Sequence, residues 1–305
     1  MAKRKARPRE ERVEITPIAE LFPDLPIRAP ELKLPRLRDP IWTGNKASLV
    51  ARYLYYFVLI THHGTYIDGF AGPQDPKHRN MWAAKLVLDS EPKFITKFFI
   101  CDAARAQVKR LTELKAQQPK EPKRLIEIFA GDFNRRVDEI LVPETVSKSQ
   151  AAFCLLDQRT FECEWSTLKK LAAYKADTSN RIELFYFLAT GWLHRALAGV
   201  RKPATAAQVS RWWGRDDWGF LRELSGEQIR DLVVSRFKAE LGYKYVMPFP
   251  IFERAESEVV MYYMIHATDH DVAPSLMARA YRRAVRKRES AEQFAIDFPQ
   301  ALDVS

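Results

Sequence analysis

The chain has 305 residues, of which 47% are hydrophobic and 29% are charged, and its formal net charge is +10. This balance excludes a disordered or fibrous chain, and the length allows one large α/β domain or two small ones. The longest apolar run, residues 53–61, is too short to span a bilayer, and the N-terminus lacks the apolar part of a secretory signal, which predicts a cytoplasmic protein with no membrane partner.

Residues 1–40 are rich in proline and charge and have no sustained period, which indicates a basic tail followed by an extended wrapping segment. Residues 46–60 have helical character, and Gly64 follows where such a helix should stop. Short apolar runs then alternate with amphipathic stretches, as required when crossover helices join parallel strands. We expect strands near 66–70, 98–101, 125–129, 152–156 and 182–188, and helices at 81–89, 103–117, 133–141 and 165–174.

The alternation of strands and helices changes after Leu188. A helical stretch to Val200 is followed by the aromatic and basic segment 211–220 and a helix near 227–241, so we interpret 200–242 as an insertion. Two strand-like runs, 245–252 and 258–267, and a helix at 274–288 close the pattern. The sequence predicts an α/β fold over residues 41–290, a Rossmann-like, mostly parallel sheet with a C-terminal antiparallel hairpin and helices on both faces, followed by a tail at 291–305.

Acidic residues follow four of the predicted parallel strands, where an open parallel sheet binds its ligand. Asp68 follows the first strand, and small residues after it let backbone amides approach a ligand. The cofactor-binding residues that we predict in this first turn are Asp68, Gly69, Phe70 and Gly72. The acids after the next three strands are Asp102, Asp132 and Asp157.

These acids favour a cationic cofactor built on a nucleoside. Asp102 can accept hydrogen bonds from both hydroxyls of a ribose, and Asp132 with Phe133 can contact the amine and the face of an adenine. A dinucleotide fits poorly, because the GxGxxG fingerprint is absent and the acids would repel a pyrophosphate. S-adenosylmethionine, with its sulfonium and ammonium groups, fits better. The alternative is that each aspartate is only the N-cap of the helix that follows.

A family resemblance points the same way. The segment YIDGFAGP, preceded by a helix with Lys46, Tyr53 and Leu54 and followed by an acid-terminated second strand and the closing VVMYYMIHAT, resembles the three-Cys-motif partner proteins over about residues 42–285. The resemblance implies a class I methyltransferase fold that binds S-adenosylmethionine. It also implies a partner, the radical-type iron–sulfur protein with three cysteines for which the family is named.

The chain departs from related patterns at two places. The FAG element is similar to the first motif of DNA cytosine methyltransferases, but Gln74 and Asp75 replace its second glycine pair. Members of the partner family tend to have Asp-Pro and an aromatic residue after the fourth strand, whereas this chain has Asp157, Gln158 and Arg159. The motifs for methylation of an amino group or of cytosine C5 are absent, so the methyl acceptor is left open.

Two basic segments are candidates for contact with nucleic acid or another substrate. The first, Arg211, Trp212, Trp213 and Arg215, combines guanidinium groups with rings that can stack on unpaired bases or form a small hydrophobic subcore. The second lies on the last helix, where arginines at helical spacing form either a nucleic-acid-binding face or a solvated face favoured by the helix dipole. Its residues are Arg279, Arg282, Arg283 and Arg286.

Asp157 is the residue that we expect on the acceptor side, and His194, after the fifth strand, is a candidate general base. The six histidines and three cysteines lack metal-site spacing, so we predict no metal and free thiols. The sequence thus predicts transfer of a methyl group from S-adenosylmethionine to a nucleic acid or a nucleic-acid-associated substrate. The alternative is a non-catalytic module of the same fold that binds nucleic acid or the radical-enzyme partner.

Overall fold

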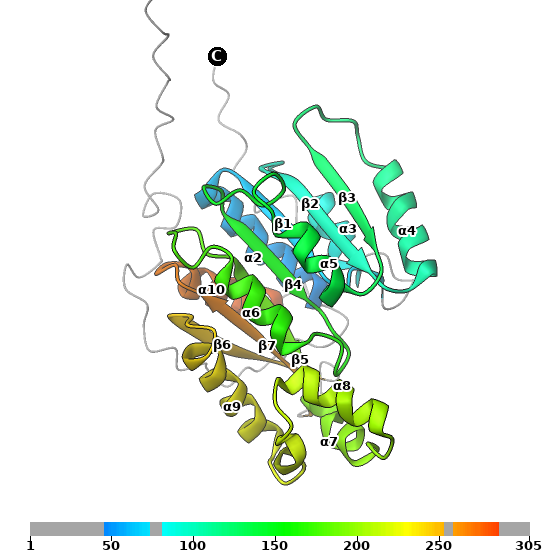
Figure 1. Cartoon of the computed structure of the whole chain (residues 1–305). Helices are drawn as coiled ribbons and strands as arrows, with labels where there is room; N and C mark the ends of the chain where they lie inside the picture. The colour runs from blue at the N-terminus through cyan, green and yellow to red at the C-terminus, as the bar shows by residue number, and fades with distance from the viewer. Residues whose placement is uncertain (1–45, 74–80, 253–258, 287–305) are drawn as a thin grey trace, which may run out of the picture.

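The computed structural model describes residues 46–73, 81–252 and 259–286. The segments expected at 1–40 and 291–305, and the Gln74–Asp75 departure, lie outside these ranges. A seven-stranded sheet in the order β3-β2-β1-β4-β5-β7-β6 forms the centre (Figure 1). The strands are β1 (Gly64–Asp68), β2 (Ile95–Asp102), β3 (Leu125–Ala130), β4 (Ala152–Leu156), β5 (Glu183–Leu188), β6 (Tyr245–Phe252) and β7 (Val260–Thr268).

Strands β1 to β5 run parallel to one another, and β7, antiparallel to both β5 and β6, continues the sheet. The predicted fold class is therefore confirmed. The helices are α2 (Lys46–Thr61), α3 (Ala83–Leu88), α4 (Arg105–Ala116), α5 (Phe133–Ile140), α6 (Trp165–Ala173), α7 (Thr190–Ala198), α8 (Pro203–Trp213), α9 (Gly226–Ala239) and α10 (Ala273–Arg286), with a 3-10 helix η3 (Trp218–Arg222).

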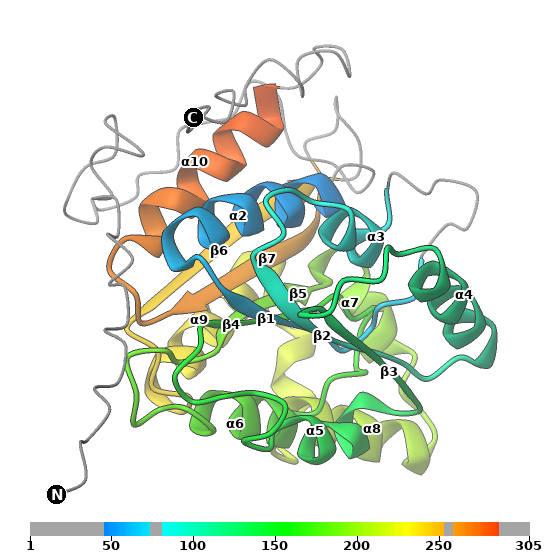
Figure 2. The same ribbon diagram turned by 90° about the horizontal axis from the view of Figure 1, so that it is seen from above.

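Helices cover both faces of the sheet, with α2, α3 and α10 on one side and α5, α6 and α8 on the other (Figure 2). Because side chains alternate along a strand, each strand contributes to two separate hydrophobic cores. Tyr66 packs under α2, and its neighbour Ile67 packs under α5 and α6. This two-sided burial explains why the parallel strands appear in the sequence as continuous apolar runs.

Two details differ from the sequence-based expectation. The first strand ends at Asp68, so Gly69 and Phe70 lie in the turn after it rather than in the strand. The 200–242 region contains α8, which the sequence did not predict, and Gly214 ends this helix in the left-handed conformation at a φ of 79°. A Cβ at Gly214 would lie 2.7 Å from the Trp165 ring, so the close approach of α8 to α6 also requires glycine.

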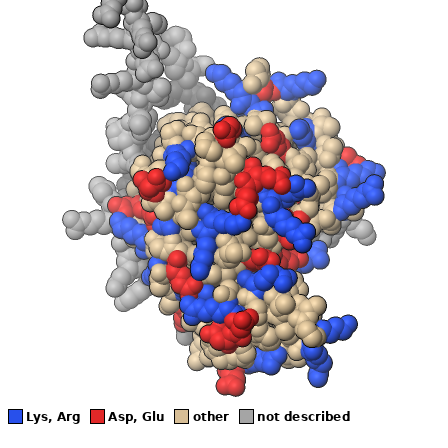
Figure 3. Space-filling view, in the orientation of Figure 1, with Lys and Arg blue, Asp and Glu red and all other residues tan. Residues whose placement is uncertain are grey.

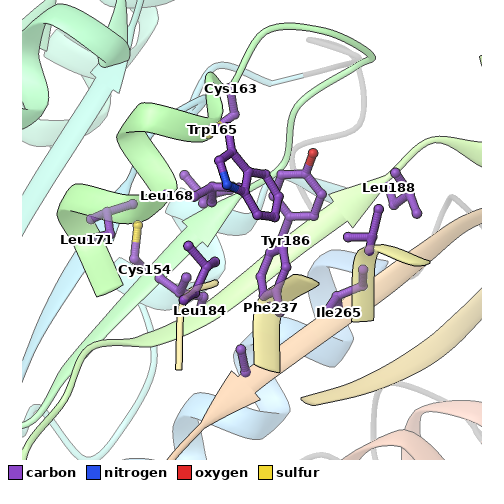
Figure 4. Close-up of a cluster of buried hydrophobic side chains, with 14 of the residues drawn as sticks. Cys154, Cys163, Trp165, Leu168, Leu171, Leu184, Tyr186, Leu188, Phe237 and Ile265 are labelled. Carbon is purple, nitrogen blue, oxygen red and sulfur yellow. The ribbon is translucent and has the colours of Figure 1, made fainter. Parts of the chain in front are cut away.

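Trp212 and Trp213 are core residues, which corrects the expectation that their rings contact nucleic acid or another substrate. Each is only 2% exposed, because α8 turns its aromatic side against the cluster around Trp165 and Phe237 (Figure 4). The Trp212 indole N–H donates to the Tyr186 hydroxyl at 2.8 Å. In this structure the two rings form the hydrophobic subcore that was the alternative interpretation, and they are not available to stack on bases.

Candidate functional site

A pocket of about 430 Å³ lies at the carboxyl ends of the parallel strands, between the turns after β1 to β4 and helix α8. It brings together eight of the predicted site residues, although they are spread over more than 140 positions of the chain. These residues are Gly69, Phe70, Gly72, Asp102, Asp132, Phe133, Asp157 and Arg211.

The other predicted residues do not line this pocket. His194 is half-buried on α7, and Arg215 is exposed and paired with Glu240 at 2.6 Å. Arg282 is exposed and Arg283 half-buried on α10, which packs against α2 and β6 on the opposite face of the sheet. The side chain of Arg286 is not among those that the structure describes. The pocket thus supports no general-base role for His194.

Asp102 is fixed at the end of β2 by the backbone of two loops. Its Oδ2 accepts a hydrogen bond from the amide of Gly72 at 2.8 Å, and its Oδ1 accepts one from the amide of Ala104 at 2.8 Å. Each carboxylate oxygen has a second lone pair, so a ligand hydroxyl can still donate to it. A Cβ at position 72 would lie 2.5 Å from Oδ2, which is why this turn needs glycine.

Asp132 and Phe133 begin helix α5 on the adjoining wall. Asp132 is the N-cap of α5, since its carboxylate accepts from the amide of Asn134 at 3.0 Å. The Phe133 ring is almost fully buried and packs against Gly69, where a Cβ would approach the ring to 2.7 Å. Asp132 therefore serves as a helix cap, as the alternative interpretation held, and it lies on the pocket wall as well.

Asp68 lies behind the pocket rather than on its wall. Its carboxylate is buried on the α2 side of the sheet, where it accepts from the Tyr66 hydroxyl at 2.9 Å and the Phe70 amide at 3.2 Å. Burial raises the pKa of Asp68 to about 7, and the two hydrogen bonds only partly oppose that rise. The alternation of side chains along β1 puts Asp68 on the same face as Tyr66, which explains why it points away from the cofactor-binding residues.

Asp157 links the pocket to the first turn of α2. Its Oδ1 lies 2.7 Å from the Nζ of Lys46, and the two side chains are 15% and 6% exposed. The Lys46 ammonium also lies 5.1 Å from the centre of the Phe187 ring and 5.0 Å from that of Tyr262, within the range of cation–π attraction. The buried Lys46 ammonium, which lies between two aromatic rings, thus fixes the Asp157 carboxylate at the end of β4.

The turn after Asp157 is braced by a buried amide. The Gln158 side chain is 1% exposed; its Oε1 accepts from the Cys163 amide at 2.9 Å, and its Nε2 donates to the Phe187 carbonyl at 3.4 Å. The next residue, Arg159, lines the pocket. In the sequence, Gln158 and Arg159 stand out only as departures from a family pattern, and nothing there predicts a structural role for them.

The surface around the pocket is mixed in charge. Basic and acidic side chains alternate over α5 and α6 on the face of Figure 3, and neither sign forms an unbroken patch there. Arg211 is paired with Glu164 at 2.7 Å on this side. Among the described residues no group of histidine, cysteine and acidic side chains could hold a metal ion. None of the described helices is long and apolar enough to cross a membrane.

The strand order and the pocket at the strand ends define the Rossmann-like α/β fold of class I methyltransferases. No family profile and no curated protein matches the chain. Solved structures similar to it include a proposed methyltransferase from Thermobifida fusca, which is 15% identical with a TM-score of 0.41 and coverage of 74% of this chain and 80% of that one.

Two other similar structures are a Legionella pneumophila protein of the DUF519 family and the CurJ carbon methyltransferase. The former is 9% identical, with a TM-score of 0.43 and coverage of 81% and 93% of the two chains. The latter is 14% identical, with a TM-score of 0.34 and coverage of 67% and 48%. Because these three TM-scores are below 0.5, the fold assignment rests on the strand order of this chain and not on these neighbours.

Proposed function

We propose that this chain is a methyltransferase that uses S-adenosylmethionine. The observation that carries the proposal is the convergence of carboxylates from three adjacent strand ends, Asp102, Asp132 and Asp157, on one pocket of about 430 Å³. This volume lies in the range of pockets that hold a cofactor-sized ligand. The place of the pocket, beyond the carboxyl ends of parallel strands, is where open α/β sheets bind nucleosides.

The residues present fit this ligand. The pocket wall contains five carboxylates, including Glu162 and Glu164, against two arginines, so it favours a ligand with positive charge. We propose that Asp102 binds the ribose hydroxyls and that Asp132 contacts the amine of the adenine, whereas the Phe133 ring, 1% exposed, packs behind Gly69 and is not available to stack on the base. The turn that contains Gly69, Phe70 and Gly72 is where backbone amides can come near the ligand.

When bound, S-adenosylmethionine supplies a methyl group on a sulfonium that is already activated for transfer. The task of the protein is then to hold the acceptor in line with that methyl group. We assign this positioning to the end of β4, where Lys46 fixes Asp157. The Asp157 carboxylate can accept a hydrogen bond from an amino or hydroxyl group of the acceptor.

For the acceptor, we propose a nucleic acid or a nucleic-acid-associated substrate, on the ground of the charge of +10. The resemblance to the three-Cys-motif partner proteins adds a radical iron–sulfur protein as a candidate partner. The non-catalytic module is the second candidate, because Gln74 departs from the related first motif and because Gln158 and Arg159 stand where the partner family has a proline and an aromatic residue.

Calorimetry with S-adenosylmethionine and S-adenosylhomocysteine tests the proposal. The parent protein should bind both, and Asp102→Asn should weaken S-adenosylmethionine binding at least tenfold, because a charge-assisted hydrogen bond is worth about 1.5–3 kcal/mol. Asp177→Asn is the matched control, since Asp177 is exposed and its one ion pair within the described ranges is with exposed Lys148. A folded parent that binds neither ligand would leave the non-catalytic module as the function.

Replacement of Asp102 with alanine should affect folding stability as well as ligand binding. Asp102 accepts two backbone hydrogen bonds, so Asp102→Ala would remove the partners of Gly72 and Ala104 as well as the ligand contact. Asp102→Asn keeps the size of the side chain and one acceptor oxygen. Its thermal unfolding should be measured beside its ligand affinity, so that a loss of binding can be separated from a loss of structure.

A further inference from the structure

The two arginines of the pocket lie together at one end of it. The wall built by the ends of β2 and β3 contributes acidic side chains, of which Asp102 and Asp132 are the charged members. The wall built by the turn after β4 and by α8 contributes both arginines of the pocket, Arg159 and Arg211. Arg159 follows Asp157 by two residues, so both cations of the pocket lie at the acceptor end of the proposed site, beside the carboxylates of Asp157, Glu162 and Glu164.

The backbone of Arg159 is held in place on both sides. Its amide donates to Glu162 Oε2 at 2.7 Å, and its carbonyl accepts from the Trp192 indole N–H at 3.3 Å. The buried Gln158 side chain ties the same turn to β5. The turn therefore presents the Arg159 side chain from a fixed position, and little ordering of the backbone is needed when a ligand binds.

The guanidinium groups have free donors. Arg159 has no side-chain hydrogen bond or ion pair with any residue in the described part of the chain, although it lines the pocket. Arg211 uses its Nε for Glu164, and within the same ranges its two terminal nitrogens donate to no protein group. A guanidinium with unused donors in a fork geometry matches the oxygens of a phosphate.

We propose that Arg159 and Arg211 bind a phosphate group of the methyl acceptor, next to the atom that receives the methyl group. The proposal rests on the function proposed above and specifies the chemistry of its substrate. Phosphate is favoured over other anions because the whole molecule carries a charge of +10, which attracts phosphate-rich ligands. The phosphate can belong to a nucleic-acid strand or to a free nucleotide, and the experiment distinguishes the two.

The test measures binding of two probes in the presence of S-adenosylhomocysteine: a fluorescent single-stranded 12-nucleotide DNA and cytidine monophosphate. Arg159→Gln should weaken binding of the probe that fits by about fivefold or more. For the oligonucleotide, the dependence of log affinity on log salt concentration should become shallower by about 0.7, the value for one lost phosphate contact. Arg159→Lys should keep the salt dependence and lose part of the affinity, because lysine lacks the bidentate fork.

Arg201→Gln is the matched control. Arg201 is exposed and does not line the pocket, so its removal takes away one positive charge without touching the site. The same proteins are titrated with S-adenosylmethionine, whose own carboxylate is the competing partner for an arginine. Arg159→Gln should leave that affinity unchanged, and its melting temperature should equal that of the parent.

Three results would overturn the proposal: neither probe binds the parent, Arg159→Gln and Arg201→Gln have equal effects, or Arg159→Gln weakens S-adenosylmethionine as much as it weakens the probe. The last result would assign the arginine to the cofactor. A parent that binds no S-adenosylmethionine but still binds a probe through Arg159 would refute the methyltransferase function alone, and the phosphate site would then belong to a binding module.

Discussion

At the scale of single residues, the aspartates at the ends of β1 and β4 differ in what compensates their charge. Asp68 is buried beside a tyrosine and has no cationic partner among the described residues, whereas Asp157 is held by Lys46 and reaches the pocket. The sequence alone places both at strand ends and suggests the same role for both. The difference arises from which face of the sheet each side chain enters.

Asp68 should make the stability of the protein depend on pH. Its pKa is about 7 in the folded protein because of burial, and near 3.9 in an unfolded chain. Between these values the folded state keeps a proton that the unfolded state has released. The free energy of unfolding should therefore fall as pH rises from about 4 to 7, by up to about 1.4 kcal/mol per pH unit, and then level off.

Urea denaturation of the parent and of Asp68→Asn at several pH values measures this effect. The asparagine cannot titrate, so the stability difference between the parent and the variant should decrease with pH in that window and become constant above it. Other titrating groups cancel in the difference. A difference that does not change between pH 4 and 7 would show that Asp68 is ionised throughout.

The Lys46–Asp157 pair should contribute far more to stability than a surface pair. Lys46→Met removes a buried cation from beside the Asp157 carboxylate, and loss of one partner of a buried pair costs about 3–5 kcal/mol; the partial exposure of Asp157 favours the lower end. Lys148→Met breaks the exposed Lys148–Asp177 pair and should cost less than about 1 kcal/mol. Equal costs in denaturant titrations would contradict the burial of the first pair.

Part of the candidate site could be predicted at this scale. Strand-end geometry identifies Asp102, Asp132 and Asp157, because the hydrophobic runs that precede them are unambiguous. Lys46 was noticed only as part of a family pattern, since nothing local relates it to a carboxylate 111 positions away. Arg159 and Gln158 could not be assigned, because their roles depend on contacts with β5 and Trp192 that form only in the folded chain.

At the scale of elements, the sequence predicts strand boundaries best where an apolar run is bounded sharply, both in the fully buried β4 and in the half-buried edge strand β6. The bounds of β4 and β6 agree with the expectation to the residue, because apolar runs there end abruptly. Helix α8 is not predicted from the sequence, because its first two turns are built of small and polar residues and its large apolar residues lie at its C-terminal end. Segments rich in alanine have weak hydrophobic periodicity, so the buried side of α8 becomes evident only from its packing against α6.

The packing of α8 on α6 leads to a stability prediction. Trp213 is buried and stacks with the Arg236 guanidinium, which lies 4.1 Å from its ring centre and 3.8 Å from that of Trp165. Trp213→Ala should therefore lower the free energy of unfolding by about 3–5 kcal/mol, as expected for loss of a large core side chain. Thermal and urea unfolding measure this.

Phe220→Ala provides the comparison, because Phe220 contacts Trp213 but is 41% exposed. Its cost should be about 1 kcal/mol or less. If Trp213→Ala unfolds like the parent and instead loses affinity for an oligonucleotide, the ring is exposed in solution and the packing described here is incorrect.

At the scale of the whole molecule, the positive charge belongs to the residues that the structure describes. The residues outside the described ranges contain 15 basic and 15 acidic side chains, so the formal charge of +10 falls entirely on the described residues. The N-terminal segment alone cannot account for an attraction to polyanions. The mixed surface of Figure 3 indicates that this charge is spread rather than gathered on that face.

The arginines of α10 test whether the charge on the opposite face matters. If nucleic acid binds there, replacing Arg282, Arg283 and Arg286 with glutamine should make the salt dependence of oligonucleotide binding shallower by up to about 2, at roughly 0.7 for each phosphate contact on a single strand. Binding titrations over a range of salt concentrations measure the slope. An unchanged slope would identify this helix surface as a solvated face.

Alkylation of the three cysteines can report where the folded molecule opens first. Cys101, Cys154 and Cys163 are all buried, and burial raises the pKa of each thiol above its usual value, so thiol-alkylating reagents should find no reactive group in the native state. Cys101 and Cys154 lie in β2 and β4, while the amide of Cys163 is tied to Gln158 in the turn that presents Arg159. The order in which the thiols become alkylated would then separate opening of the acceptor end from unfolding of the sheet.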